Sequence, residues 1–189
     1  IRKILSAGAD KVVLNTIAIK RPEFISEAAE VFGSSTIVVA IETTKEKDGN
    51  YLAYTDNGRV FTGIEIFKWA KEVEKRGVGE ILITSIDSEG TGDGFDIKLV
   101  SEMCKRVRIP VVAHGGAGEK EHIKNLFQKT DCDGIAISSF LHYGCLNSLK
   151  KKMKINLKIE GNKEFILSGR KTYKNFKQEN VKSLKKYLI

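Results

Sequence analysis

The stretch Thr36-Ile-Val-Val-Ala-Ile41 is apolar almost throughout and rich in β-branched residues. Such a run predicts a strand that is buried on both faces, because helices cover both faces of most parallel sheets. Similar short apolar runs occur at residues 12–14, 80–84, 110–113 and 134–137. The sequence therefore predicts a sheet of buried strands that includes residues 36–41.

Amphipathic helical patterns separate these apolar runs. They cover residues 22–31, 63–76, 95–107 and 120–128. Strands that alternate with helices predict a parallel sheet whose connections are crossover helices. The sequence therefore predicts the α/β class.

A longer gap follows the strand at 36–41, and it has the pattern of a β-hairpin. Residues 50–55 and 60–62 flank the sequence Asp56-Asn-Gly58, and Asn57-Gly58 is a strong signal for a tight turn. We expect this hairpin insertion at the carboxyl end of the strand, where folds of this kind bind their ligands.

Five candidate strands outside the hairpin are too few to close an eight-stranded barrel. Two architectures remain: an open α/β sheet, or a (β/α)8 TIM barrel of which about strands 4–8 are present. Residues 1–8 have the pattern of a helix that stops at Gly8, and a domain rarely begins at the end of a helix. This start favours a single partial barrel domain over residues 1–189, with its N-terminal part missing.

An internal similarity also favours the barrel. Residues 7–16 resemble residues 130–139, so that Asp10 aligns with Asp133 and the pair Asn15-Thr16 aligns with Ser138-Ser139. Such an internal repeat predicts a barrel with two-fold pseudo-symmetry, in which the two segments form equivalent polar rims.

Small hydrogen-bonding residues follow the apolar runs, at the expected carboxyl ends of the strands. They are Asn15, Thr16, Thr84, Gly115, Gly116, Ser138 and Ser139. Glycines let backbone amides approach an anion, and hydroxyl groups donate to it. We therefore expect a phosphate-binding site formed by Gly115, Gly116, Ser138 and Ser139. The alternative is that the glycines serve only a tight turn after the strand. The internal repeat predicts a second phosphate at Asn15 and Thr16.

Candidate acid–base groups lie at other strand ends. Glu42 directly follows the strand at 36–41. We interpret it either as a general acid/base or as a carboxylate that only leads the chain from the core into solvent. Asp87 and Glu89 lie in a glycine-rich loop, where they contact substrate or cap a turn. The histidines match no metal-ligand spacing, so we expect no metal and no cofactor.

The 32 Lys and Arg against 24 Asp and Glu give a net charge of +8, which is unevenly distributed. Residues 143–189 hold 13 of the basic and 3 of the acidic side chains. We interpret 144–178 as a basic insertion before a last helix at 180–189. Its surface is either simply solvated or a patch for an acidic partner, and nucleic-acid binding is the weaker interpretation.

Composition excludes several classes of protein. No apolar run reaches membrane-spanning length, and no signal peptide is visible. Cys104, Cys132 and Cys145 are odd in number and form no CxxC pair, which disfavours a disulfide scaffold and a zinc ribbon. We therefore expect a cytoplasmic protein with no membrane partner.

Several separate motifs together resemble one known family. They are Gly8-Ala-Asp-Lys-Val-Val-Leu-Asn-Thr16, Val38-Val-Ala-Ile41, Gly79-Glu-Ile-Leu-Ile-Thr-Ser-Ile-Asp87 with Gly90-Thr91, and Gly115-Gly-Ala-Gly118. From residue 1 to about 143 the chain is similar to the cyclase subunit of imidazole glycerol phosphate synthase, a (β/α)8 barrel of histidine biosynthesis.

The resemblance implies an ammonia-dependent cyclase-lyase. Such enzymes convert a bis-phosphorylated ribulosyl-aminoimidazole carboxamide nucleotide to imidazole glycerol phosphate and aminoimidazole carboxamide ribotide. Ammonia comes from a glutaminase subunit and passes through the barrel. The resemblance places one phosphate at Asn15 and Thr16, and the other at Gly90, Gly116, Ser138 and Ser139. It also places Lys11 and Glu80 in a charged ring that gates ammonia, and Asp10 on the glutaminase-facing side.

The chain departs from the family pattern at chemically important positions. The family uses two catalytic aspartates, of which one lies on the absent first strand and the other corresponds to Glu42. Glu89 replaces the usual aspartate of the Asp-Gly-Thr loop, and His114 is also unusual. These changes fit an alternative: a paralogous barrel subunit that conducts ammonia for a surface-sugar amidotransferase, with little cyclase activity.

Two further interpretations remain open: another phosphate-binding barrel, such as a sugar-phosphate isomerase, and a nucleic-acid-binding protein with a basic tail. We also expect that the 189 residues alone are insoluble or partly unfolded, because a partial barrel exposes raw sheet edges.

Overall fold

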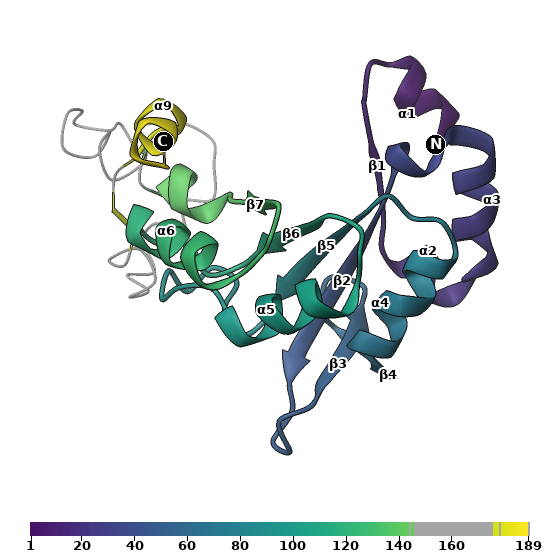
Figure 1. Ribbon diagram of the computed structural model, residues 1–189, viewed down its shortest axis with the longest axis horizontal. Coiled ribbons are helices and arrows are strands. Elements are labelled where there is room, and N and C mark those ends of the chain that lie inside the picture. The colour runs from purple at the N-terminus through teal and green to yellow at the C-terminus, as the bar shows by residue number, and fades with distance from the viewer. Residues whose placement is uncertain (144, 146–175, 178, 189) are drawn as a thin grey trace, which may run out of the picture.

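A seven-stranded sheet forms the centre of the computed structural model, which describes residues 1–143, 145, 176–177 and 179–188 (Figure 1). The strands are β1 (Val12–Leu14), β2 (Ile37–Lys45), β3 (Tyr51–Thr55), β4 (Val60–Glu65), β5 (Glu80–Ser85), β6 (Val111–His114) and β7 (Gly134–Ala136). Their order is β4-β3-β2-β5-β6-β7, and β1 also pairs with β2. Strands β1, β2, β5, β6 and β7 run parallel, which confirms the predicted α/β fold and agrees with part of a (β/α)8 barrel.

One helix precedes the first strand, and further helices connect the parallel strands. They are α1 (Arg2–Ser6), α2 (Thr16–Lys20), α3 (Glu23–Phe32), the 3-10 helix η1 (Ser34–Thr36), α4 (Ile66–Lys75), α5 (Ile97–Arg106) and α6 (Lys120–Lys129). In two of these helices the side chain of an acidic N-cap residue accepts hydrogen bonds from the first turn: Glu65 caps α4, and Asp96 caps α5. Figure 1 shows α4 and α5 over one face of the sheet.

Strand β2 is the structural centre because it has three partners. Its first residues pair with β1 in parallel, and residues 42–45 pair with β3 in antiparallel on the same edge. Its other edge pairs with β5. The predicted strand at 36–41 was therefore too short, because the hairpin supplies hydrogen-bond partners that prolong β2 to Lys45.

The predicted hairpin is present, with two changes at its ends. Asp56, Asn57 and Gly58 all have positive φ, as expected for a tight turn. Strand β4 continues to Glu65, so the helix predicted from residue 63 begins only at Ile66. The side chain of Glu65 sets this boundary because it caps the helix.

The two faces of the sheet differ in environment. In β1, Val12 and Leu14 are buried, whereas the intervening Val13 is 52% exposed. Alternate residues of a strand point to opposite faces, so Val13 identifies the face away from the packed core. Polar residues of the candidate site lie on this same face.

The C-terminal helix α9 (Val181–Leu188) packs beside α6, and both lie at the β7 end of the sheet in Figure 1. Leu184 is buried, and Tyr187 donates to Glu121 of α6 at 2.5 Å. The interpreted basic insertion at 144–178 lies almost entirely outside the described residues. Within the described part of the chain, no helix has both the length and the apolar character needed to cross a membrane.

Candidate functional site

A row of polar side chains crosses three neighbouring strands near their carboxyl ends. The backbone register aligns Glu42 of β2 with Thr84 of β5, and Thr84 with His114 of β6. Aligned residues of parallel strands point to the same face, so these three side chains lie side by side. We call Glu42, Thr84 and His114 the polar row.

Glu42 is held at both carboxylate oxygens. The side-chain amide of Asn15 donates to Oε1 at 2.8 Å, and the backbone N–H of Gly58 donates to Oε2 at 2.8 Å. Asn15 follows β1, whereas Gly58 belongs to the β3–β4 turn. The carboxylate is therefore fixed between a neighbouring strand end and the hairpin. Each oxygen keeps a further lone pair for a substrate proton.

Thr84 and His114 form the other half of the polar row. Thr84 Oγ1 lies 3.1 Å from His114 Nδ1, so the two side chains share a hydrogen bond whose direction depends on the histidine tautomer. Thr84 is buried, with 5% exposure. This hydrogen bond orients the imidazole of His114, which lines a neighbouring pocket.

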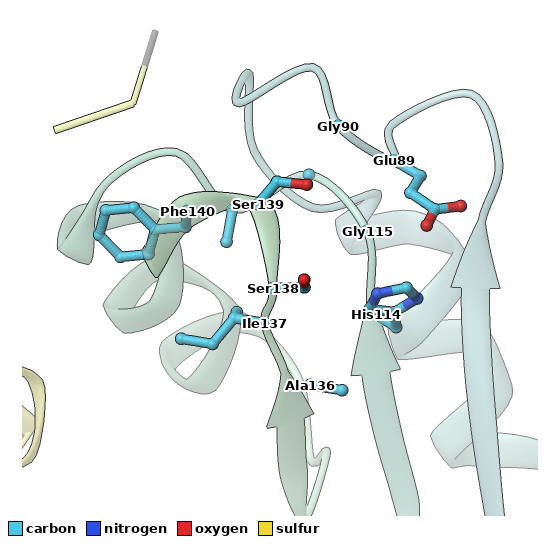
Figure 2. A pocket seen from close by; sticks show the side chains of 11 residues that line it. Glu89, Gly90, His114, Gly115, Ala136, Ile137, Ser138, Ser139 and Phe140 are labelled. Atoms are coloured by element: carbon cyan, nitrogen blue, oxygen red, sulfur yellow. The ribbon is translucent and has the colours of Figure 1, made fainter. Parts of the chain in front are cut away.

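That pocket lies between the ends of β5, β6 and β7 (Figure 2). It is lined by Glu89, Gly90, His114, Gly115, Gly116, Ala117, Ala136, Ile137, Ser138, Ser139 and Phe140. The pocket thus brings together five residues that the sequence analysis assigned to one phosphate: Gly90, Gly115, Gly116, Ser138 and Ser139. Figure 2 also shows the Glu89 carboxylate on the His114 side of the pocket.

Gly115 and Gly116 have a packing role as well. Both have positive φ, and a Cβ on Gly116 would lie 2.0 Å from the carbonyl oxygen of Gly94. A Cβ on Gly115 would lie 2.7 Å from the carbonyl oxygen of Ser85. The loop after β6 therefore packs directly on the loop after β5, and only glycine permits this approach.

Asp87 lies outside the pocket lining. Its Oδ2 accepts from the backbone N–H of Lys45 at 2.8 Å and thereby connects the loop after β5 to the end of β2. This contact gives Asp87 a structural role in shaping the carboxyl edge of the sheet.

Asn15 and Thr16 lie together at the opposite end of this edge, after β1. Asn15 uses its amide nitrogen for Glu42, and its Oδ1 is buried with no hydrogen-bond partner. Thr16 exchanges hydrogen bonds with Asp56 of the β3–β4 turn. The parallel strands β2, β5 and β6 separate this pair from the pocket at β7.

Asp10, Lys11 and Glu80 lie at the other end of the strands. Lys11 precedes β1, Glu80 opens β5, and their side chains form an ion pair at 2.6 Å. The pair spans the start of β2. Asp10 is exposed beside it. The residues predicted to face a partner are therefore separated from the polar row by the length of the strands.

Sequence reasoning missed two members of the site. Gly58 was identified only as a turn residue, although its N–H holds Glu42, and Asp56 was not connected to Thr16. Gly58 is 16 positions from Glu42, and Asp56 is 40 positions from Thr16. The hairpin predicted after the strand at 36–41 could have indicated these contacts, because it folds back toward that strand. The register of the hairpin, which decides the contacts, was not visible in the sequence.

Cys104 and Cys132 are not suited to nucleophilic chemistry. Burial raises the pKa of the Cys104 thiol to about 11, and it raises that of Cys132 as well. A thiol with a raised pKa is protonated at neutral pH and reacts slowly. Cys104 packs against the core. In the part of the chain that the structure covers, no three side chains of His, Cys, Asp or Glu are grouped to hold a metal ion.

Comparison with known proteins gives one consistent result. Residues 1–147 match the sequence profile of the family described as histidine biosynthesis protein. Imidazole glycerol phosphate synthase subunit HisF of Bacillus cereus strain Q1 is 45% identical over 153 residues, which are 80% of this chain and 61% of that relative. The protein of the same name from B. cereus strain G9842 is 46% identical over 153 residues, with the same coverage.

The chain thus spans about three fifths of the length of these relatives, 61% in each case. The matched region includes every strand in the described part of the chain and the whole polar row. From this match and the parallel α/β sheet, we conclude that the chain belongs to the histidine biosynthesis protein family of (β/α)8 barrels.

Proposed function

We propose that the protein containing this chain is the cyclase subunit of an imidazole glycerol phosphate synthase. It would use ammonia to convert the bis-phosphorylated ribulosyl-aminoimidazole carboxamide nucleotide to imidazole glycerol phosphate and aminoimidazole carboxamide ribotide. The observation that carries this proposal is the 45% identity to relatives of that name over 153 residues, a region that includes the polar row.

The substrate's two phosphates would bind at the two ends of the carboxyl edge. Thr16 and Asn15 lie after β1, and Ser138 and Ser139 lie after β7. Four strand-to-strand steps of about 4.8 Å separate β1 from β7, a span of roughly 20 Å around the curved sheet. A long substrate with a phosphate at each end suits this separation, and its reacting centre would lie over the polar row.

Glu42 is our candidate for the general acid/base. The two hydrogen bonds from Asn15 and Gly58 fix its carboxylate, which reduces the entropy lost in reaching a reactive geometry. Thr84 and His114 would complete the wall of the site next to Glu42. A second carboxylate, on a strand that this chain does not include, is expected from the family resemblance.

A glutaminase subunit is the proposed partner. Its docking surface would include Asp10 and the ion pair of Lys11 with Glu80 at the amino end of the strands. Ammonia released there would travel along the inner face of the sheet to the polar row. We place the protein in the cytoplasm, where free thiols such as those of Cys104 and Cys132 persist.

The decisive experiment is turnover of the bis-phosphorylated substrate with ammonium salts as the nitrogen source, using the full-length protein. We expect product formation by the wild type and a loss of at least about 100-fold in kcat for Glu42→Gln. The matched control is Glu46→Gln, which changes a carboxylate beyond the end of β2. A folded wild-type protein that binds substrate without turning it over would contradict the proposal and favour the ammonia-conducting subunit.

A further inference from the structure

The β3–β4 turn holds an acidic side chain against Thr16. Thr16 Oγ1 donates to Asp56 Oδ1 at 3.4 Å and accepts from the Asp56 backbone N–H at 3.2 Å. Lys20, one helical turn after Thr16, has its Nζ 3.7 Å from Asp56 Oδ2. A hydroxyl group and an ammonium group therefore converge on one carboxylate of the same chain.

A phosphate group would use the same donors. Phosphate oxygens accept hydrogen bonds from hydroxyl groups and pair with lysine, as the carboxylate oxygens of Asp56 do here. Thr16 is also one of the residues proposed to bind a substrate phosphate. The Asp56 carboxylate and that phosphate cannot both occupy the space between Thr16 and Lys20, and their like charges repel.

The Asp56 contacts are weak enough to exchange. The side chains of Lys20 and Asp56 are 63% and 47% exposed, and exposed ion pairs of this length contribute little because water screens them. The turn itself is held independently, because Gly58 donates to Glu42 and a Cβ on Gly58 would lie 3.0 Å from Ile86. The Asp56 side chain can therefore rotate away while the turn stays in place.

We propose that Asp56 is an internal competitor for the anion site formed by Thr16 and Lys20. The phosphate-bearing end of a substrate binds there by displacing the Asp56 carboxylate. The residue thereby lowers the affinity of the site for anions in general and selects for a doubly charged phosphate, which offers Lys20 more charge than a carboxylate does. The assignment of the ligand as a phosphate rests on the proposed function.

The test is calorimetric titration of the full-length protein with inorganic phosphate at constant ionic strength. Asp56→Asn removes the competing charge and keeps the size of the side chain, so we expect phosphate to bind about three- to tenfold more tightly. The matched control is Asp48→Asn, which removes one charge at the opposite end of the hairpin and should leave the affinity unchanged. Circular dichroism confirms that each variant is folded.

Thr16→Val tests whether the gain in phosphate affinity arises at the anion site formed by Thr16 and Lys20. In the Asp56→Asn, Thr16→Val double variant the gain should disappear, whereas phosphate binding at the β7 end should persist in all variants. Equal or weaker binding by Asp56→Asn would overturn the inference, and so would a gain that survives Thr16→Val or an equal gain in Asp48→Asn. This titration involves no turnover, so failure of the cyclase assay with a positive titration would reject only the proposed function.

Discussion

The side-chain amide of Asn15 donates to the carboxylate of Glu42 at 2.8 Å, across the boundary between β1 and β2. Sequence analysis assigned Asn15 to phosphate binding, yet its amide nitrogen is already committed to the candidate acid/base. We therefore expect Asn15 to position Glu42 in addition to its proposed place at the phosphate site. Loss of the first role would lower kcat, and loss of the second would raise KM.

Asn15→Ala should reduce kcat more than it raises KM. Loss of the amide leaves Glu42 with one of its two hydrogen bonds, and misplacement on the ångström scale costs about 100-fold in rate. Steady-state kinetics with ammonium salts would measure both constants. A large increase in KM with an unchanged kcat would instead show that Asn15 acts only in phosphate binding.

Glu42→Asp tests whether the longer side chain is needed to reach the hairpin. The carboxylate would shift by about one methylene, or roughly 1.5 Å, so it could not keep both the Asn15 and the Gly58 contacts. We expect the β3–β4 turn to lose its anchor and the amide of Gly58 to exchange faster with solvent deuterium. The amide of Gly49, at the other end of the hairpin, should be unaffected, and unchanged exchange at Gly58 would show that Glu42 does not hold the turn.

Two glycines with positive φ offer a matched pair for stability. Gly116→Ala would place a Cβ 2.0 Å from a backbone oxygen at φ +112°, whereas Gly90→Ala would meet nothing within 4 Å at φ +73°. Strain alone costs about 1–2 kcal/mol, so Gly90→Ala should fall in that range. Gly116→Ala should cost at least about 3 kcal/mol, because the backbone must also shift. Urea unfolding of both variants would measure this difference, and equal losses would refute the close packing of the two loops.

Cysteine reactivity should follow burial. The pKa of Cys104 is raised to about 11, so its reactive thiolate is scarce at neutral pH and increases as the pH approaches that value. We expect iodoacetamide at pH 7.5 to label the exposed Cys145 first, with Cys104 and Cys132 following slowly. Mass spectrometry over time would reveal the order. Rapid labelling of Cys104 would mean that α5 opens more readily than its packing suggests.

The ion pair of Lys11 and Glu80 should contribute little to stability. The Lys11 side chain is 46% exposed, and exposed pairs contribute about 0–1 kcal/mol. Lys11→Met should therefore leave the unfolding midpoint nearly unchanged. Because Lys11 lies on the proposed docking surface, the same substitution should impair turnover with glutamine and the glutaminase more than turnover with ammonium salts. Lys105→Met, in an exposed pair on α5, is the control and should alter neither activity.

Local patterns in the sequence were sufficient to predict the parallel strands and the Asn57-Gly58 turn. Apolar runs and turn residues act over a few positions, so they can be recognised without knowledge of the fold. The extension of β2 to Lys45 could not be predicted in this way, because it depends on pairing with β3. The helix α2 was also missed, since its five residues carry no amphipathic repeat.

In the candidate site, too, the individual residues could be predicted from local patterns, but their contacts could not. Polar residues at strand ends were identifiable one by one, and the pocket brings Gly116 and Ser139 together as expected. The alignment of Glu42 with Thr84 follows only from the strand register. The contact of Asp56 with Thr16 depends on the way the hairpin folds over β1, which no local pattern encodes.

The shared edge of β2 has a consequence for how this protein can vary. One end of that edge belongs to β1 and the other to β3, so each end has its own ladder of hydrogen bonds. Insertions or deletions in the hairpin can therefore reshape the rim around Glu42 without disturbing the register of β1 at the opposite end. A single strand thus lets the rim around Glu42 diversify while the rim that carries Lys11 and Glu80 stays constant.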